Sequence, residues 1–281
     1  MTRRIDSHQH YWRTARGDYG WLNPDLGPIC RDFLPADLAP LIADCGIEAT
    51  ILVQAAPTVA ETEFLLDIAA KTPSIAGVVG WVDFDAPEVV ADIARLARNP
   101  KLVGLRPMIH DIADEHWMLR PAFDRVFRTL STQGLVFDAL VRPPHLPHLD
   151  ILATRYPDLP IVVDHGAKPL IATGIREPWA RNLSRLAMHG NVVCKLSGLV
   201  TEAGADWSAA TLRPFMDLVA DTFGTRRILF GSDWPVLNLA GTYRQWFDIA
   251  KDFVASRADL DIDAVFGGNA ARIYLARSER E

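Results

Sequence analysis

The sequence predicts an α/β fold, a (β/α)8 barrel that forms a single domain over residues 1–281. Apolar segments of strand length alternate eight times with helical segments, and strict alternation of this kind implies a parallel sheet. Neither a shift in composition nor a low-complexity stretch marks a domain boundary. The competing architecture is an open, doubly wound sheet, but the Gly-rich turn that usually follows its first strand is replaced here by histidines.

The first half of the chain supplies four predicted strands. The opening strand, residues 3–10, leads into a long loop over residues 11–28 that is rich in Gly, Pro and aromatic residues. Three further strands cover residues 49–54, 75–83 and 102–108. The first of these is continuously apolar, as a strand buried on both faces should be. Apolar residues at helical spacing predict the intervening helices at residues 35–45, 59–71, 87–98 and 121–132.

The second half repeats the same unit four times. The predicted strands cover residues 135–141, 160–165, 191–196 and 227–233. The predicted helices cover residues 146–155, 179–188, 212–222 and 243–254. A last helix over residues 269–276 closes the chain, and the eight strands together allow a barrel without free edges.

Charge and cysteine content exclude several classes of protein. With 29 basic and 35 acidic residues the net charge is −6, which argues against a nucleic-acid-binding protein. No stretch is apolar enough to cross a membrane or to act as a signal peptide. The three cysteines Cys30, Cys45 and Cys194 are widely spaced and form no CxxC motif, so we expect a reducing cytoplasm.

Reactive side chains end nearly every predicted strand. Active sites of barrels lie at the C-terminal ends of the strands, and His8 and His10 share one side of the first strand because strand side chains alternate. When a single strand ends in a charged residue, the simplest explanation is that the strand reaches the surface there. That explanation does not account for so many strands that end in reactive residues on one face. They are His8, His10, Gln54, Trp81, Arg106, His110, Asp164, His165, Lys168, Lys195, Asp233 and Trp234.

Three motifs resemble those of the amidohydrolase superfamily, of the amidohydrolase 2 type. They are Ile-Asp-Ser-His-Gln-His at residues 5–10, Val-Val-Asp-His-Gly-Ala-Lys-Pro at 162–169 and Leu-Phe-Gly-Ser-Asp-Trp-Pro at 229–235. Three more are similar to the sugar-lactonase branch, which includes L-fuconolactonases, L-rhamnonolactonases and 2-pyrone-4,6-dicarboxylate lactonases: Tyr-Gly-Trp-Leu at 19–22, Gly-Trp-Val-Asp at 80–83 and Val-Gly-Leu-Arg at 103–106.

The resemblance implies hydrolysis of a cyclic ester, with Asp233 accepting a proton from water. His8, His10 and His165 match metal ligands of the superfamily and, together with Asp233, could hold one zinc ion. The chain departs from metal-dependent members by offering Arg106 on the fourth strand and Lys195 on the seventh. These cations, or Lys168, could replace the metal as electrophile, so zinc-dependent and metal-free catalysis both stay open. The predicted catalytic residues are Asp233, His8, His10, His165 and Lys195.

The predicted pocket residues indicate a sugar lactone. We expect Trp21, Trp81 and Trp234 to stack on a sugar ring, and the side chains of Gln54, Arg106, His110 and Lys168 to bind its hydroxyls. Only Arg106 and Arg142 lie near strand ends, which favours a neutral aldonolactone, L-fuconolactone or a close relative, over a dicarboxylate.

Other readings stay open at this stage. One alternative is a pyrone-dicarboxylate lactonase, and another is a metal-dependent decarboxylase of an aromatic or dienoic acid. A non-catalytic sugar-acid-binding protein is the third, although the retained Asp233 and histidines speak against it. The expected partner is a small molecule, with neither nucleic acid nor membrane, and a homo-oligomer is left open.

Overall fold

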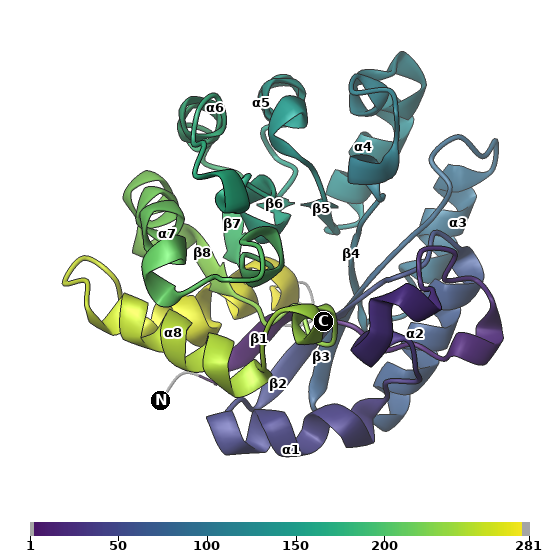
Figure 1. The fold of residues 1–281 in the computed structure, drawn as a ribbon. Helices are drawn as coiled ribbons and strands as arrows, with labels where there is room; N and C mark the ends of the chain where they lie inside the picture. The colour runs from purple at the N-terminus through teal and green to yellow at the C-terminus, as the bar shows by residue number, and fades with distance from the viewer. Residues whose placement is uncertain (1–2, 277–281) are drawn as a thin grey trace.

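The computed structural model describes residues 3–276 and confirms the predicted barrel (Figure 1). Eight parallel strands pair in chain order, and helices surround them on the outside. The strands are β1 (Ile5–Gln9), β2 (Ala49–Val53), β3 (Ile75–Gly80), β4 (Leu102–Leu105), β5 (Val136–Ala139), β6 (Ile161–Val163), β7 (Val192–Leu196) and β8 (Ile228–Phe230).

Two backbone hydrogen bonds join the last strand region to the first. The amide of Asp233 donates to the carbonyl of His8 at 2.8 Å, and the amide of His10 donates to the carbonyl of Trp234 at 2.7 Å. Gln9 and Trp234 form a parallel bridge at the same place. The barrel therefore closes at the point where the sequence places its most reactive residues.

Asp6 strengthens this closure from inside the barrel wall. Its Oδ1 accepts from the amides of His8, at 3.1 Å, and Ser232, at 2.9 Å, while its Oδ2 accepts from the Tyr243 hydroxyl at 3.0 Å. One buried carboxylate thus fixes β1, the end of β8 and the following helix relative to one another, which sets the position of His8.

The outer layer contains the eight predicted helices, each packed by its apolar stripe against the strands. Their bounds are α1 (Pro35–Cys45), α2 (Val59–Lys71), α3 (Val89–Leu96), α4 (Asp124–Thr132), α5 (Leu146–Arg155), α6 (Trp179–Leu186), α7 (Ala209–Phe223) and α8 (Tyr243–Ala255). Within residues 3–276 no helix is both long and apolar enough to span a membrane.

Some predicted elements end at other residues in the structure. β4 stops at Leu105, before Pro107, because proline has no amide to donate to a sheet. β6 stops at Val163, because the backbone of the following residues turns into the left-handed region. The helix predicted over 121–132 begins with a tighter turn, Pro121–Phe123, before α4.

The C-terminal residues close the opposite end of the barrel. Helical segments at Ala264–Gly268 and Ala271–Leu275 replace the single helix predicted over 269–276, so this region begins earlier than expected. Ala270 and Tyr274 pack with barrel-lining residues such as Ile5 into an apolar cluster distinct from the larger core between strands and helices. The barrel is therefore a filled core at this end, and its C-terminal end alone is left for a pocket.

Candidate active site

A cavity of about 210 Å³ lies at the C-terminal ends of the strands, where active sites of barrels are found. Its walls come from loops that follow β1, β2, β4, β5, β6 and β8. The lining residues are His10, Trp21, Ala55, Arg106, Met108, His110, Asp111, Leu140, His165, Lys168, Asp233 and Val236. A small, mainly apolar cavity with a few polar groups is suited to one small molecule.

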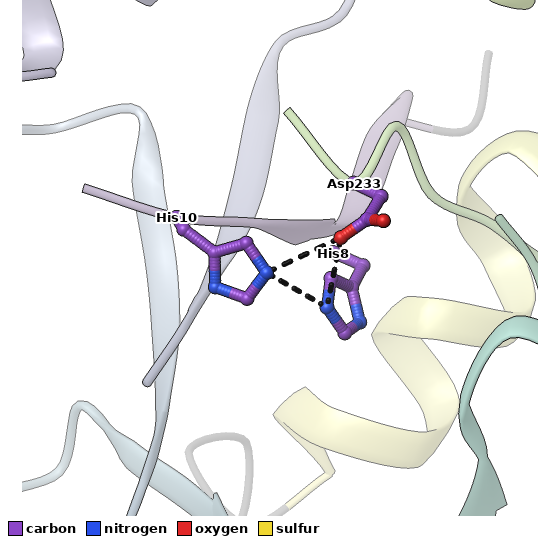
Figure 2. Close-up of side chains that lie close together, drawn as sticks. All are labelled: His8, His10 and Asp233. Atoms are coloured by element: carbon purple, nitrogen blue, oxygen red, sulfur yellow. Dashed lines mark hydrogen bonds and ion pairs between the residues drawn. The ribbon is translucent and has the colours of Figure 1, made fainter. Parts of the chain in front are cut away.

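Histidine nitrogens gather around one carboxylate oxygen of the cavity (Figure 2). Oδ1 of Asp233 lies 3.3 Å from Nε2 of His10, 3.7 Å from Nε2 of His8 and 3.8 Å from Nε2 of His165. Nε2 of His8 and Nε2 of His10 are 3.2 Å apart. All four side chains are buried. Asp233 is thus the centre of the histidine cluster.

The hydrogen bonds of His10 indicate that a proton or a metal ion is needed between His10 and Asp233. Nδ1 of His10 lies 2.8 Å from the carbonyl of Val53, which can only accept, so the proton of a neutral His10 is on Nδ1. Its Nε2, 3.3 Å from the Asp233 carboxylate, presents a lone pair when the ring is neutral and donates a hydrogen bond when the ring is protonated. Two facing lone pairs repel unless a proton or a metal ion lies between them.

Three of these atoms have the spacing of zinc ligands. Zn–N bonds of about 2.0–2.1 Å in a tetrahedron separate neighbouring ligand atoms by about 3.3 Å, and Nε2 of His8, Nε2 of His10 and Oδ1 of Asp233 lie 3.2, 3.3 and 3.7 Å from one another. Among the described residues, His8, His10 and Asp233 form one group with metal-ligand spacing, and His8, Asp164 and His165 form a second. The fold therefore brings three of the four predicted metal ligands into one group, and His165 belongs to the other.

The surroundings keep Asp233 ionised. Burial alone would raise the pKa of its carboxyl, but neighbouring His165 and His10 outweigh this effect, and the pKa falls to about 2. Burial also lowers the pKa of His8 and of His165 well below the usual value, so both imidazoles are neutral at pH 7. The site thus combines a carboxylate base with uncharged histidines.

A strained turn after β6 presents His165 and Lys168 to the cavity. His165, Ala167 and Lys168 all have positive φ angles, of 55°, 63° and 51°, which non-glycine residues rarely adopt. Asp233 has a φ of 60°. Strain of this kind is concentrated at functional sites, because it costs stability and is retained where a side chain must point in one direction.

Gln54 orients the guanidinium of Arg106. Its Oε1 accepts from Arg106 Nη2 at 2.8 Å and from Nε at 3.2 Å, and its backbone carbonyl accepts from Nη2 as well. Nη1 of Arg106 lies 3.5 Å from Oδ2 of Asp164. Gln54, predicted to bind substrate, instead holds a residue that lines the cavity.

The predicted site residues fall into three positions. Seven line the cavity, namely His10, Trp21, Arg106, His110, His165, Lys168 and Asp233. His8, Gln54 and Lys195 are fully buried behind that lining. Trp81 and Trp234 are not among the lining residues either, and Trp234 packs edge-on against Tyr11 and Phe33. Their stacking on a sugar stays a prediction.

Other functional positions were not predicted. The apolar wall formed by Met108, Leu140 and Val236 carries no motif, since these residues follow strand ends in loops of ordinary composition. Asp138 is different: it is buried inside β5 and accepts from Lys195 Nζ at 2.5 Å. An acidic residue inside an otherwise apolar strand was the signal that could have identified it.

The family model for the amidohydrolases matches residues 5–275 of the chain. The chain belongs to the amidohydrolase family. This amidohydrolase is 47% identical over 278 residues to an L-fucono-1,5-lactonase of Burkholderia ambifaria, a match that covers 98% of this chain and 96% of that protein. It is 39% identical over 285 residues to an L-fucono-1,5-lactonase of Burkholderia multivorans, with 96% and 95% coverage.

A solved structure agrees with these relatives. The crystal structure of a Burkholderia multivorans amidohydrolase with bound zinc superimposes with a TM-score of 0.92 at 37% identity, covering 97% of this chain and 99% of that one. The resemblance to sugar lactonases predicted from the motifs is therefore confirmed.

Proposed function

We propose that this amidohydrolase hydrolyses a sugar-derived lactone, L-fucono-1,5-lactone or a close relative, to the open-chain sugar acid. The observation that carries the proposal is the buried Asp233 carboxylate, ionised beside His8, His10 and His165 at the wall of a small cavity. The identity of 47% and 39% to L-fucono-1,5-lactonases over nearly the whole chain supports the substrate class.

Asp233 serves as the proton acceptor in this reaction. It takes a proton from water as the water oxygen forms a bond to the lactone carbonyl carbon, and negative charge develops on the carbonyl oxygen. The ring C–O bond then breaks, and the proton held by Asp233 passes to the leaving alkoxide. The products are one hydroxyl group and one carboxylic acid, so Asp233 returns to its starting state.

His8, His10, His165 and Asp233 would hold a single divalent ion, for which we propose zinc. When bound, the ion would supply Lewis-acid activation of water and of the lactone carbonyl. The support is the metal-ligand spacing of His8, His10 and Asp233, the position of His165 Nε2 at 3.8 Å from Oδ1 of Asp233, and the bound zinc in the related Burkholderia multivorans structure. The protein itself positions water beside Asp233 and excludes bulk solvent from the buried cluster.

The cavity favours a neutral substrate with an apolar face. Arg106 is already engaged by Gln54 and Asp164, and Nζ of Lys168 donates to Glu202 at 2.6 Å, so neither cation is free to neutralise a dicarboxylate. Trp21 and the wall of Met108, Leu140 and Val236 offer contact to carbon-bound hydrogens of a deoxy-sugar ring.

His110 complements this wall as a polar but uncharged group. Burial, together with the positive charges of Lys168, Arg106 and Arg142, lowers the pKa of His110 to about 3, so the imidazole is neutral at pH 7. It is thereby suited to hydrogen bonds with sugar hydroxyls rather than to pairing with a carboxylate.

A proton-release assay across a substrate panel tests the proposed function. The panel contains L-fucono-1,5-lactone, its stereoisomers, other aldonolactones, 2-pyrone-4,6-dicarboxylate and an aromatic acid as decarboxylase substrate. We expect hydrolysis that is fastest for a neutral deoxy-sugar lactone. Equal rates across all lactones, or activity confined to the acids, would reject the proposal. Repeating the panel after metal removal and after zinc addition determines the metal requirement.

We also propose that the enzyme works in the cytoplasm. The three cysteines are all free thiols, and two of them, Cys45 and Cys194, are buried. Unpaired cysteines are usual in reducing compartments. The formation of a homo-oligomer stays a prediction from the sequence.

A further inference from the structure

A series of buried polar side chains runs through the barrel from its closed end to the cavity. The Tyr274 hydroxyl donates to Oδ1 of Asp138 at 2.8 Å, and Oδ2 of Asp138 accepts from Lys195 Nζ at 2.5 Å. Nζ of Lys195 lies 3.1 Å from Nδ1 of His8. All four side chains are buried, and none of Tyr274, Asp138 and Lys195 takes part in the proposed reaction steps.

The contact with Lys195 determines what Nδ1 of His8 can do. Lys195 lies against two carboxylates, Asp138 and, at 3.0 Å, Asp164, and is therefore an ammonium group. An ammonium only donates hydrogen bonds, so this contact favours Nδ1 of His8 as an acceptor. Because a neutral imidazole carries one proton, the contact with Lys195 favours that proton on Nε2.

The opposite edge of the His8 ring points to the same tautomer. In a neutral His10, Nε2 presents a lone pair, since Nδ1 donates to the Val53 carbonyl. Nε2 of His8 lies 3.2 Å from that lone pair and 3.7 Å from Oδ1 of Asp233. A proton on Nε2 of His8 would thus lie between two acceptors that otherwise repel each other.

Two other neighbours favour the opposite tautomer. Oδ1 of Asp164 lies 3.4 Å from Nδ1 of His8, and Nη1 of Arg106 lies 3.3 Å from Nε2. With the proton on Nδ1, however, the lone pairs of His8 and His10 would face each other at 3.2 Å. A metal ion between the two nitrogens would remove that repulsion. The two tautomers therefore correspond to a metal-free and a metal-bound site.

We propose that Lys195 is a positioning residue that holds the His8 proton on Nε2 in the metal-free enzyme, and that Asp138 and Tyr274 hold Lys195 in place. A divalent ion binds at Nε2 of His8 only after that proton has moved to Nδ1 and the Lys195–His8 hydrogen bond has broken. Lys195 therefore weakens metal binding. This inference rests on the proposed function in that it concerns the metal site of the same pocket.

Nitrogen NMR of the metal-stripped protein tests the tautomer directly. In protein labelled with ¹⁵N-histidine, protonated and unprotonated ring nitrogens have well-separated chemical shifts, and a His8→Gln variant assigns the His8 signals. We expect the proton on Nε2 in the metal-free protein and on Nδ1 after zinc addition. A proton on Nδ1 in the metal-free protein would overturn the inference.

Zinc titration by calorimetry tests the role of Lys195. Lys195→Met removes the ammonium and should raise the zinc association constant at least about tenfold, the size of effect typical for residues that contact metal ligands. Tyr274→Phe should change it in the same direction by a smaller factor. Tyr156→Phe is the matched control, because its hydroxyl donates to Asp124 at 2.9 Å between outer helices; its zinc affinity should equal that of the wild type.

An unchanged or weaker zinc affinity in folded Lys195→Met would contradict the proposal. If this variant fails to fold, two measurements still test the proposal: the position of the His8 proton in the wild-type NMR spectrum and the zinc affinity of Tyr274→Phe. Failure here is distinct from failure of the proposed function: a lactonase whose metal-free His8 carries its proton on Nδ1 rejects only the inference. A protein without lactonase activity whose His8 carries it on Nε2 rejects only the function.

Discussion

The backbone of Gly198 passes directly against the imidazole of His165, so that a methyl group on Gly198 would overlap Nδ1 of the ring. On the same side the ring is held by Ser197, whose Oγ lies 2.9 Å from Nδ1. The direction in which His165 enters the cavity therefore depends on the lack of a side chain at Gly198, which follows β7, the strand paired with β8.

Gly198→Ala should accordingly displace His165 and reduce kcat/KM by at least about tenfold, because misplacement of an active-site group by an ångström is costly. Gly174→Ala is a matched control. Both glycines have left-handed backbone, with φ of 62° and 67°, but no atom lies within 4 Å of an added Cβ at Gly174. Both variants should lose stability in urea unfolding because of the left-handed backbone, Gly198→Ala more because of the overlap with His165, while Gly174→Ala keeps full activity. Equal activity of the two variants would show that His165 tolerates displacement.

Asp233→Asn should abolish lactone hydrolysis. Asparagine has the shape of aspartate but cannot accept a proton, so we expect kcat to fall by about two to four orders of magnitude, the range typical for general-base catalysis. Steady-state proton-release kinetics on L-fucono-1,5-lactone provides the measurement. A kcat within about tenfold of wild type would show that another group accepts the proton.

Gln54→Met should raise KM more than it lowers kcat. The substitution removes the Oε1 acceptor that aligns the Arg106 guanidinium but leaves Asp233 and the histidines untouched. Arg106 can then adopt several rotamers and binds the substrate with a larger loss of entropy. Gln133→Met, at the C-terminal end of α4, serves as a control outside the cavity. A fall in kcat without any change in KM would instead place Arg106 in the reaction step.

Glu61 should make the protein less stable as the pH rises. Its carboxyl is fully buried, and burial raises its pKa from 4.5 to about 8, although Oε1 accepts from the Ala55 amide at 2.9 Å. Between pH 4.5 and 8 the folded state therefore holds a proton that the unfolded state releases, so the free energy of unfolding decreases with increasing pH.

Glu61→Gln removes this titration while it keeps the acceptor for Ala55. The variant should be more stable than wild type by at least about 1 kcal/mol at pH 8.5 and should show a flatter pH dependence. Urea unfolding at pH 5 and pH 8.5 measures both effects. Glu63→Gln, on the exposed side of the same helix, should leave the pH dependence unchanged; if it flattens the curve equally, Glu61 is not the cause.

The periodicity of the sequence was sufficient to predict the barrel, because each of its eight units repeats the same apolar pattern. It was also sufficient to predict that His8, His10, His165 and Asp233 lie near one another, because the C-terminal ends of parallel strands meet at one face of the barrel. Depth along the strand was harder to predict. His8 and Lys195 each lie one residue before the end of their strand, and neighbouring side chains bury them completely. Which strand residues are covered in this way depends on the tilt and stagger of the strands in the closed barrel.

Side chains in loops were the other difficulty. Trp81 follows a strand as Asp233 does, but its backbone is bound to the hydroxyl of Thr62 on α2, and its ring lies outside the cavity lining. Met108 and Val236 line the cavity because the backbone conformation of their loops directs them toward it. Loop conformation depends on tertiary contacts that leave no periodic pattern in the sequence.

The closing of the barrel by the C-terminal residues has a consequence for biosynthesis. Tyr274, which supports Asp138 and through it Lys195, comes after all eight strands in the chain. A nascent chain can pair its first strands early, but the polar series behind His8 is complete only once Tyr274 has been synthesised. A copy that is truncated or cleaved before Tyr274 should therefore contain all eight strands and still lack the support of Asp138 and Lys195.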